Sequence, residues 1–318
     1  MKRRIVILSV LSAVLLAVAG GSCYMLSFSL DADEGRGDVE RSLAVLYDRA
    51  PDMRQWTDSV RRCGLLRDTA VIMPTGERHH ALYMRGDSAH GKTAVVVHGY
   101  KDDCYKFLFL GRMYHQRLGY NILLPDLHAH GMSEGGDIQM GWKDRLDVKR
   151  WTEVADSLFS DSCHSSRIVV HGVSMGAATT MCLSGESGLL PSVRAFVEDC
   201  GYTSVWDEFS LQLREQFSLP EFPLMQTTSL LCQLRHGWSF AEASPLAQVS
   251  RCRLPMLFIH GDADTFVPFS MLRPLYDAKP EPKAMYVAKG SEHARAYLDH
   301  PEEYTSVVSR FLRPYMDE

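Results

Sequence analysis

Short apolar runs alternate with segments of helical character over most of the chain. The runs lie at residues 70–73, 80–84, 93–98, 121–124, 167–171, 195–199, 255–260 and 284–287. The later runs are continuously apolar, which is typical of strands buried on both faces in a parallel sheet whose crossovers are helices. The pattern therefore predicts an α/β fold, a mostly parallel central sheet flanked by helices, over residues 69–318. We expect the first two strands to form an antiparallel hairpin at one edge.

Two segments interrupt this alternation. Residues 31–68 are predicted to form a polar linker and then a helix that packs beside the sheet, with Leu43, Leu46 and Trp56 on its apolar side. Residues 201–249 separate two predicted strands by more than an ordinary connection and are rich in aromatic residues, Leu and Pro. We interpret residues 201–249 as a short helical cap over the site, with a peripheral packed helix pair as the alternative.

The first 30 residues form a separate segment. Lys2, Arg3 and Arg4 precede a stretch, residues 5–30, that contains no Asp, Glu, Lys, Arg or His. About 20 apolar residues span a bilayer as a helix, and flanking basic residues stay on the cytoplasmic side. We therefore predict a single membrane anchor at residues 1–30 with the remainder of the chain outside the cytoplasmic membrane.

Two alternatives give the same side of the membrane. The small residues Ala17-Val18-Ala19 before Gly20 resemble a signal-peptide cleavage site, and cleavage there would release a secreted protein. Cys23 is the position at which a lipoprotein would be acylated. Whether the N-terminus is cleaved stays open at this stage.

Composition narrows the possible partners. The net charge is −5 and the charges are scattered, so there is no basic field of the kind that nucleic acids require. The eight cysteines form no CxxC pair and the thirteen histidines no HExxH motif, so we expect no catalytic metal. We interpret Cys182 and Cys200 as buried thiols. Disulfide pairing, including that of Cys163, and the oligomeric state stay open.

The strongest chemical signal is Gly172-Val173-Ser174-Met175-Gly176, which follows the apolar run at 167–171 and precedes small residues suited to a helix start. A serine at such a sharp turn between strand and helix is held in strained backbone geometry, and the glycines let the chain reverse without a clash. The hydroxyl of Ser174 is thereby exposed. The pentapeptide alone also occurs by chance, so its meaning depends on a nearby base.

A base and an acid follow along the chain. After the strand at 255–260 comes His260-Gly261-Asp262-Ala263-Asp264, and after the strand at 284–287 comes Lys289-Gly290-Ser291-Glu292-His293. A serine hydroxyl needs a general base that a third group orients. The order Ser, Asp, His, with each residue just beyond the end of a strand, is that of α/β hydrolases.

From residue 69 to residue 312 the chain resembles an α/β-hydrolase-fold serine hydrolase of the prolyl-oligopeptidase-like and esterase-like group, especially its bacterial membrane-anchored members. It does not contain the N-terminal propeller of true prolyl oligopeptidases. The residues that carry the resemblance are His98-Gly99-Tyr100, the segment from Asp126 to Ser133, the Ser174 turn, His260-Gly261-x-x-Asp264-x-x-Val267-Pro268 and Gly290-x-x-His293.

The resemblance implies specific roles. Ser174 attacks an acyl carbonyl, His293 takes and returns the proton, and Asp264 orients the imidazole. Asp262 is the less favoured acid and is expected to bond the loop backbone. The backbone N–H groups of Met175 and Tyr100 are expected to form the oxyanion hole.

The other histidines receive structural roles. The segment from Asp126 to Ser133 is interpreted as a brace for the nucleophile turn, and His98, His171 and His260 as hydrogen-bonded residues at the strand ends. No cofactor is implied, because nucleophile, base and electrostatic stabilisation all come from the polypeptide.

The expected activity is hydrolysis of a carboxylic ester, or of a related acyl bond, on a small or medium acyl substrate. A serine peptidase or an acyltransferase would use the same triad. A membrane-tethered binding protein without turnover is the alternative from another class, although such a protein has no need of all three residues.

Overall fold

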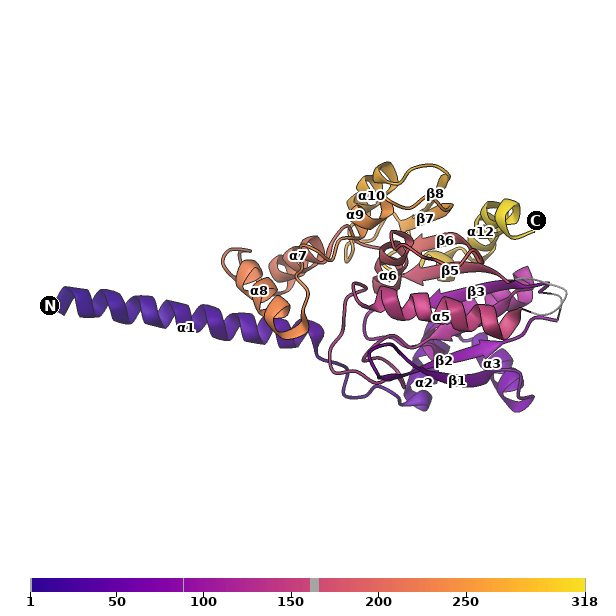
Figure 1. Ribbon diagram of the computed structural model, residues 1–318, viewed down its shortest axis with the longest axis horizontal. Coiled ribbons are helices and arrows are strands. Elements are labelled where there is room, and N and C mark those ends of the chain that lie inside the picture. The colour runs from indigo at the N-terminus through magenta and orange to yellow at the C-terminus, as the bar shows by residue number, and fades with distance from the viewer. Residues whose placement is uncertain (1, 88, 161–165, 318) are drawn as a thin grey trace. The chain divides into compact units, whose positions relative to one another are not determined.

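The computed structural model describes residues 2–87, 89–160 and 166–317 (Figure 1). Its contacts divide the chain into two compact units. The larger unit comprises Ala32–Thr203 and Pro245–Glu318, and the smaller comprises Met1–Asp31 and Ser204–Ser244. Cys163, whose pairing the sequence leaves open, lies outside the described residues.

An eight-stranded sheet forms the centre of the larger unit, in the order β1-β2-β4-β3-β5-β6-β7-β8. The β1–β2 and β2–β4 pairs are antiparallel, and every other pair is parallel. The mostly parallel sheet and the antiparallel edge hairpin are therefore confirmed. The strands are β1 (Arg67–Ile72), β2 (Arg78–Met84), β3 (Lys92–Val97), β4 (Asn121–Pro125), β5 (Arg167–Val173), β6 (Val193–Asp199), β7 (Met256–Gly261) and β8 (Lys283–Ala288).

Helices cover both faces of this sheet. Helices α5 and α6 contact the central strands on one face (Figure 1). Alternate side chains such as Val96, Ile122 and Val169 project from the other face into a buried cluster with α2, α3, α4 and α12. The helices of this unit are α2 (Val39–Arg49), α3 (Met53–Arg62), α4 (Leu108–Arg112), α5 (Asp144–Phe159), α6 (Met175–Ser184), α9 (Pro245–Val249), α10 (Leu272–Ala278), α11 (Ala296–Asp299) and α12 (Pro301–Met316), with the short turns η1 (Tyr105–Phe107), η2 (Met113–Arg117) and η3 (Phe269–Met271).

The segment before the sheet differs from its prediction. The sequence pattern favours one helix with Leu43 and Trp56 on a common face, but the chain forms α2 and α3 as separate helices. Pro51 lies between them, and a proline has no N–H with which to continue a helical ladder. Leu43 and Trp56 are both buried in the same core cluster, so the predicted packing beside the sheet is found.

The smaller unit is helical. It contains α1 (Lys2–Leu30), α7 (Val205–Phe217) and α8 (Leu224–His236). Helix α8 lies along the C-terminal part of α1 (Figure 1), where the hydroxyls of Ser22 and Thr227 are 2.6 Å apart. The insertion predicted at residues 201–249 is thus helical, and its part Ser204–Ser244 belongs to the same unit as α1.

No disulfide bond joins the cysteines in the described part of the chain. Cys182 and Cys200 are both buried, in agreement with the expectation from the sequence. Burial raises the pKa of the Cys200 thiol well above its usual value, so this residue stays protonated at neutral pH.

Candidate active site

Ser174 lies at the turn between β5 and α6 in a backbone conformation that residues other than glycine rarely adopt, with φ 58° and ψ −120°. Its glycine neighbours are sterically required. A Cβ on Gly172 would lie 1.9 Å from the carbonyl oxygen of Gly176, and one on Gly176 would lie 2.2 Å from that of Val97. The tight strand–turn–helix therefore projects the Ser174 hydroxyl away from the sheet.

The three residues that the sequence assigns to the triad come together from three loops. The Oγ of Ser174 is 2.8 Å from Nε2 of His293, and Nδ1 of His293 is 2.7 Å from Oδ2 of Asp264. Both nitrogens of the imidazole are therefore engaged, one by the hydroxyl and the other by a carboxylate. This is the arrangement in which an imidazole can take a proton from a serine.

Asp264 is held more firmly than its neighbour Asp262. Its Oδ1 accepts the backbone N–H groups of Phe266 and Val267, each at 3.0 Å. Burial alone would raise the pKa of Asp264, but hydrogen bonds from His260 and His293 outweigh burial and lower this pKa below its usual value. Asp264 is thus a carboxylate at neutral pH.

Asp262 has a different partner. Its Oδ1 accepts the backbone N–H of Gly290 at 2.5 Å, and this bond connects the loop after β7 to the loop that carries His293. The aspartate that contacts His293 is Asp264, and Asp262 contacts loop backbone.

A cavity of about 460 Å³ opens at the Ser174 hydroxyl. Ser174 and His293 line it together with both aromatic and charged residues. The charged ones are already engaged, Arg49 with Asp102 and Arg295 with Asp299. Its apolar lining comes from Tyr100, Phe107, Phe109, Phe266 and Leu298.

The two residues expected to form the oxyanion hole, Met175 and Tyr100, lie close to Ser174. Met175 follows Ser174 directly and begins α6, where the first N–H groups of a helix have no partner within the helix. Tyr100 lines the same cavity as Ser174. Its neighbour Gly99 is so close that a Cβ there would lie 3.4 Å from Cβ of Ser174.

The segment after β4 braces the Tyr100 loop. Nε2 of His130 accepts the backbone N–H of Lys101 at 3.1 Å, and Oδ1 of Asp126 accepts that of Cys104 at 2.8 Å. Burial lowers the pKa of His130 to about 3, so its imidazole is neutral and able to accept. The sequence indicates a brace for the Ser174 turn, whereas His130 and Asp126 accept hydrogen bonds from the loop that carries Tyr100.

The other strand-end histidines are hydrogen-bonded as the sequence suggests. Nε2 of His98 accepts the backbone N–H of Leu127 at 3.0 Å, and Nε2 of His260 lies 2.9 Å from the carbonyl oxygen of Val267. His171 lies between the hydroxyls of Tyr114 and Tyr304, at 3.0 and 2.9 Å.

Sequence reasoning missed a buried acid, Asp199, that contacts the backbone of Ser174. The carbonyl oxygen of Asp199 accepts the N–H of Ser174 at 2.8 Å, and its carboxylate accepts the hydroxyl of Tyr304, also at 2.8 Å. Burial raises the pKa of Asp199 to about 6. In the sequence, Asp199 is marked only by its position at the end of an apolar run. Many acidic residues follow a strand in this way, so the position does not show that this one contacts the site.

Comparison with known proteins agrees with this architecture. The model of the alpha/beta hydrolase family matches residues 94–307, a range that begins within β3, continues through β8 and includes Ser174, Asp264 and His293. The chain belongs to this family. The matched range ends within α12, and the helical insertion falls inside it.

Two proteins of similar sequence are described as uncharacterized proteins. The chain is 32% identical to YqkD of Bacillus subtilis (strain 168) over 223 residues, which are 70% of this chain and 69% of YqkD. It is 25% identical to YfhR of Escherichia coli (strain K12) over 195 residues, which are 61% of this chain and 60% of YfhR. The match thus spans less than two thirds of YfhR.

Solved structures show the same fold at low identity. The esterase Pf2001 of Pyrococcus furiosus aligns with a TM-score of 0.62 at 23% identity, over 79% of this chain and 93% of the esterase. The acylaminoacyl peptidase of Pyrococcus horikoshii aligns with a TM-score of 0.59 at 16% identity, over 78% of this chain and 41% of the peptidase. At these identities, both likenesses concern the fold.

Proposed function

We propose that this protein is a serine hydrolase that cleaves a carboxylic ester, or a related acyl bond, through an acyl-enzyme intermediate. The observation that carries this proposal is the chain of contacts from Ser174 through His293 to Asp264 at the mouth of a cavity. Membership of the alpha/beta hydrolase family supports the same class of chemistry.

In the proposed mechanism, His293 carries the proton in each step. Ser174 Oγ forms a bond to the acyl carbon while its proton moves to Nε2 of His293, and the carbonyl oxygen becomes an oxyanion. When the tetrahedral intermediate collapses, His293 returns that proton to the leaving alcohol. Water then attacks the acyl carbon while His293 takes a proton from it. His293 returns this proton to Ser174 Oγ as the bond to the acyl group breaks, and the carboxylic acid leaves.

Asp264 acts through His293 in both steps. Its carboxylate accepts the Nδ1–H of the imidazole, which selects the tautomer whose Nε2 has a free lone pair. The same carboxylate stabilises the imidazolium that forms. Backbone N–H groups of Met175 and Tyr100 are proposed to stabilise the oxyanion, and losing one such donor typically costs about 2.7–4 kcal/mol of transition-state stabilisation.

The cavity limits the substrate. A volume of about 460 Å³ is in the range of sites for small molecules, and its aromatic lining suits an apolar acyl or alkyl group. Because the lining arginines are paired with aspartates, we assign no anionic substrate to the site. A small or medium acyl substrate fits these features.

We further propose that the protein acts outside the cytoplasmic membrane, held by α1 as a signal anchor. Helix α1 is long and apolar enough to span a bilayer, with a mean hydropathy of 2.4 in its most apolar window. By length and composition alone, a signal sequence would look the same. The basic triplet at its start supports a cytoplasmic N-terminus.

Packing within the helical unit supports the proposal that α1 stays part of the mature protein and is not cleaved off. Leu26 and Leu30 are buried there, whereas residues 5–16 of α1 are exposed. A spanning segment of about 20 residues from Ile5 would end close to Ser22, whose hydroxyl contacts Thr227 of α8. Phe222 and Leu234 of the same unit are 74% and 76% exposed, which suits a position at the lipid interface.

Matched substrates test the chemistry. Full-length protein in detergent is assayed with p-nitrophenyl esters of increasing acyl length and with the corresponding p-nitroanilides. We expect ester turnover with a burst of about one product per enzyme, and loss of both in Ser174→Ala. Faster cleavage of anilides would favour a peptidase, and product formed only with an added alcohol would favour an acyltransferase. A folded protein that turns over neither series would contradict the proposal.

A further inference from the structure

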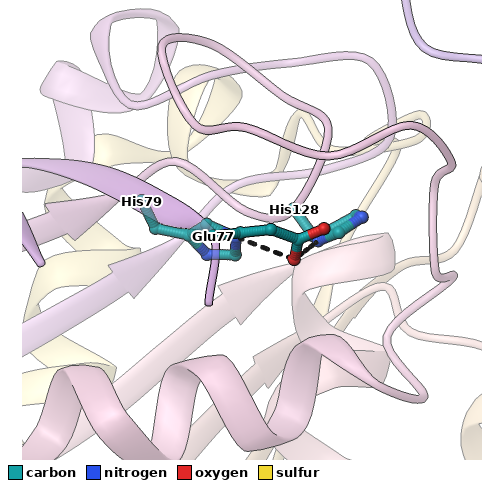
Figure 2. A group of neighbouring side chains, drawn as sticks. All are labelled: Glu77, His79 and His128. Carbon is teal, nitrogen blue, oxygen red and sulfur yellow. Dashed lines mark ion pairs between the residues drawn. The ribbon is translucent and has the colours of Figure 1, made fainter. Parts of the chain in front are cut away.

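Two histidines and a glutamate meet at the edge of the sheet, away from the triad. Figure 2 shows the Glu77 carboxylate between the imidazoles of His79 and His128. Oε2 of Glu77 lies 3.2 Å from Nδ1 of His128 and 4.0 Å from Nε2 of His79. The ligand atoms of all three residues lie within 4.8 Å of one another.

The local fold explains this meeting. Glu77 directly precedes β2 and His79 is the second residue of that strand, two positions further on. In extended chain, side chains two positions apart project on the same side. His128 comes from the loop that follows β4, the neighbour of β2 in the sheet. A Cβ on Gly135 would lie 2.5 Å from the His128 ring, so the returning loop fixes that ring closely.

His79 lacks the partners that a buried imidazole requires. It is fully buried, and neither of its ring nitrogens has a hydrogen-bond partner among the described residues. A neutral imidazole has one N–H to donate and one lone pair to satisfy, and leaving both unpaired is costly. The Nε2 of this unsatisfied ring points to the carboxylate of Glu77.

We propose that Glu77, His79 and His128 bind a divalent zinc ion through one carboxylate oxygen and two imidazole nitrogens. Ligands about 2.0–2.1 Å from a tetrahedral Zn²⁺ are separated from one another by about 3.4 Å. The separations of 3.2 and 4.0 Å are close to this value, so small side-chain movements complete the geometry. Two imidazoles and a carboxylate suit zinc better than magnesium or calcium, which prefer oxygen ligands.

Asp147 supplies the outer contact that such a site needs. Its Oδ2, on α5, lies 3.7 Å from Nδ1 of His79, the nitrogen opposite the proposed ligand atom. Histidines that bind metals generally donate their other N–H to a carboxylate or a carbonyl, which orients the ring. A slight approach of Asp147 satisfies the second nitrogen of His79.

The zinc ion has a structural role in this proposal. It would connect the β1–β2 turn to the loop after β4, and the latter holds Asp126 and His130 against the Tyr100 loop. The three ligands leave a fourth position, and the partly exposed Glu77 gives that position access to water. The inference goes beyond the proposed hydrolase function and does not depend on it.

Cobalt binding tests the site without any assay of activity. Full-length protein in detergent is stripped with a chelator and titrated with Co²⁺, whose visible d–d bands report tetrahedral coordination. We expect one equivalent to bind and to be displaced by one equivalent of Zn²⁺. Glu77→Gln and His128→Gln should abolish the bands, and Asp147→Asn should weaken binding about 10- to 100-fold.

Two control variants separate this site from others. His90→Gln removes an exposed histidine and should bind as the wild type does, and so should His293→Ala, which removes the triad base. Because the Glu77 side chain is partly exposed, Glu77→Gln should fold even if a variant at the buried His79 does not. Added Zn²⁺ should raise the thermal stability of the wild type and of the two control variants, but not that of Glu77→Gln. Equal binding by Glu77→Gln and the wild type, or loss of binding in His293→Ala, would overturn the proposal.

Discussion

Asp262 and Asp264 are two positions apart on the same loop, yet their surroundings assign them different tasks. Asp264 accepts two backbone N–H groups through one oxygen and the His293 imidazole through the other. Asp262 accepts a single backbone N–H from Gly290. A carboxylate that orients a base must be fixed itself, and only Asp264 is.

This difference predicts a matched pair of variants. Asp264→Asn replaces an oxygen beside Nδ1 of His293 with a group that favours the wrong tautomer, so kcat should fall about 10⁴-fold. Asp262→Asn keeps an oxygen that can accept from Gly290, and kcat should stay within about tenfold of wild type. Ester kinetics measure both, with circular dichroism to confirm folding. Equal losses in the two variants would contradict the assignment.

At this scale the sequence predicts which residues meet, but not what supports them. The resemblance to α/β hydrolases favours Asp264 over Asp262, and the structure puts Asp264 beside His293. The hydrogen bond from Lys101 to His130 joins two loops whose approach depends on the folded sheet. The cluster of Glu77 and His128 could not be predicted from the sequence either, because the two residues are far apart in the chain and no local spacing connects them.

At the scale of the elements, helix α1 differs from the other helices by its exposed apolar surface. Its residues from Ile5 to Leu16 are exposed and mostly apolar, which would be unfavourable in water and is expected in lipid. The strands and the edge hairpin follow from their apolar pattern. The association of α1 with α8 does not, because it joins segments about 200 positions apart through tertiary contact alone.

The exposed face of α1 predicts how the protein is retained. Leu15→Arg with Leu16→Arg puts two charges at the centre of the span, each costing about 2.5–3.5 kcal/mol on insertion scales. This variant should leave the membrane fraction after alkaline extraction, whereas Leu15→Ala with Leu16→Ala should remain. Intact mass of the retained protein should include residues 1–30. A wild-type protein that is soluble, or shortened near Gly20, would contradict an anchor.

In the whole molecule, the proposed chemistry belongs to one of the two units. Ser174, Asp264 and His293 all lie in the unit formed by Ala32–Thr203 and Pro245–Glu318, and so does the cavity beside them. The sequence predicts the sheet of this unit, because alternating buried strands and helices define it, and it puts Ser174, Asp264 and His293 each just after a strand. The natural substrate depends on side chains from several loops, and local patterns do not define their arrangement.

Covalent labelling by a fluorophosphonate probe, read by intact mass, tests the central claim that Ser174 is an activated nucleophile. The full-length protein should gain one adduct per chain. Ser174→Ala should gain none, and His293→Ala should react far more slowly because its serine lacks a base. Absence of an adduct on the folded wild-type protein, or an adduct that persists in Ser174→Ala, would contradict the account.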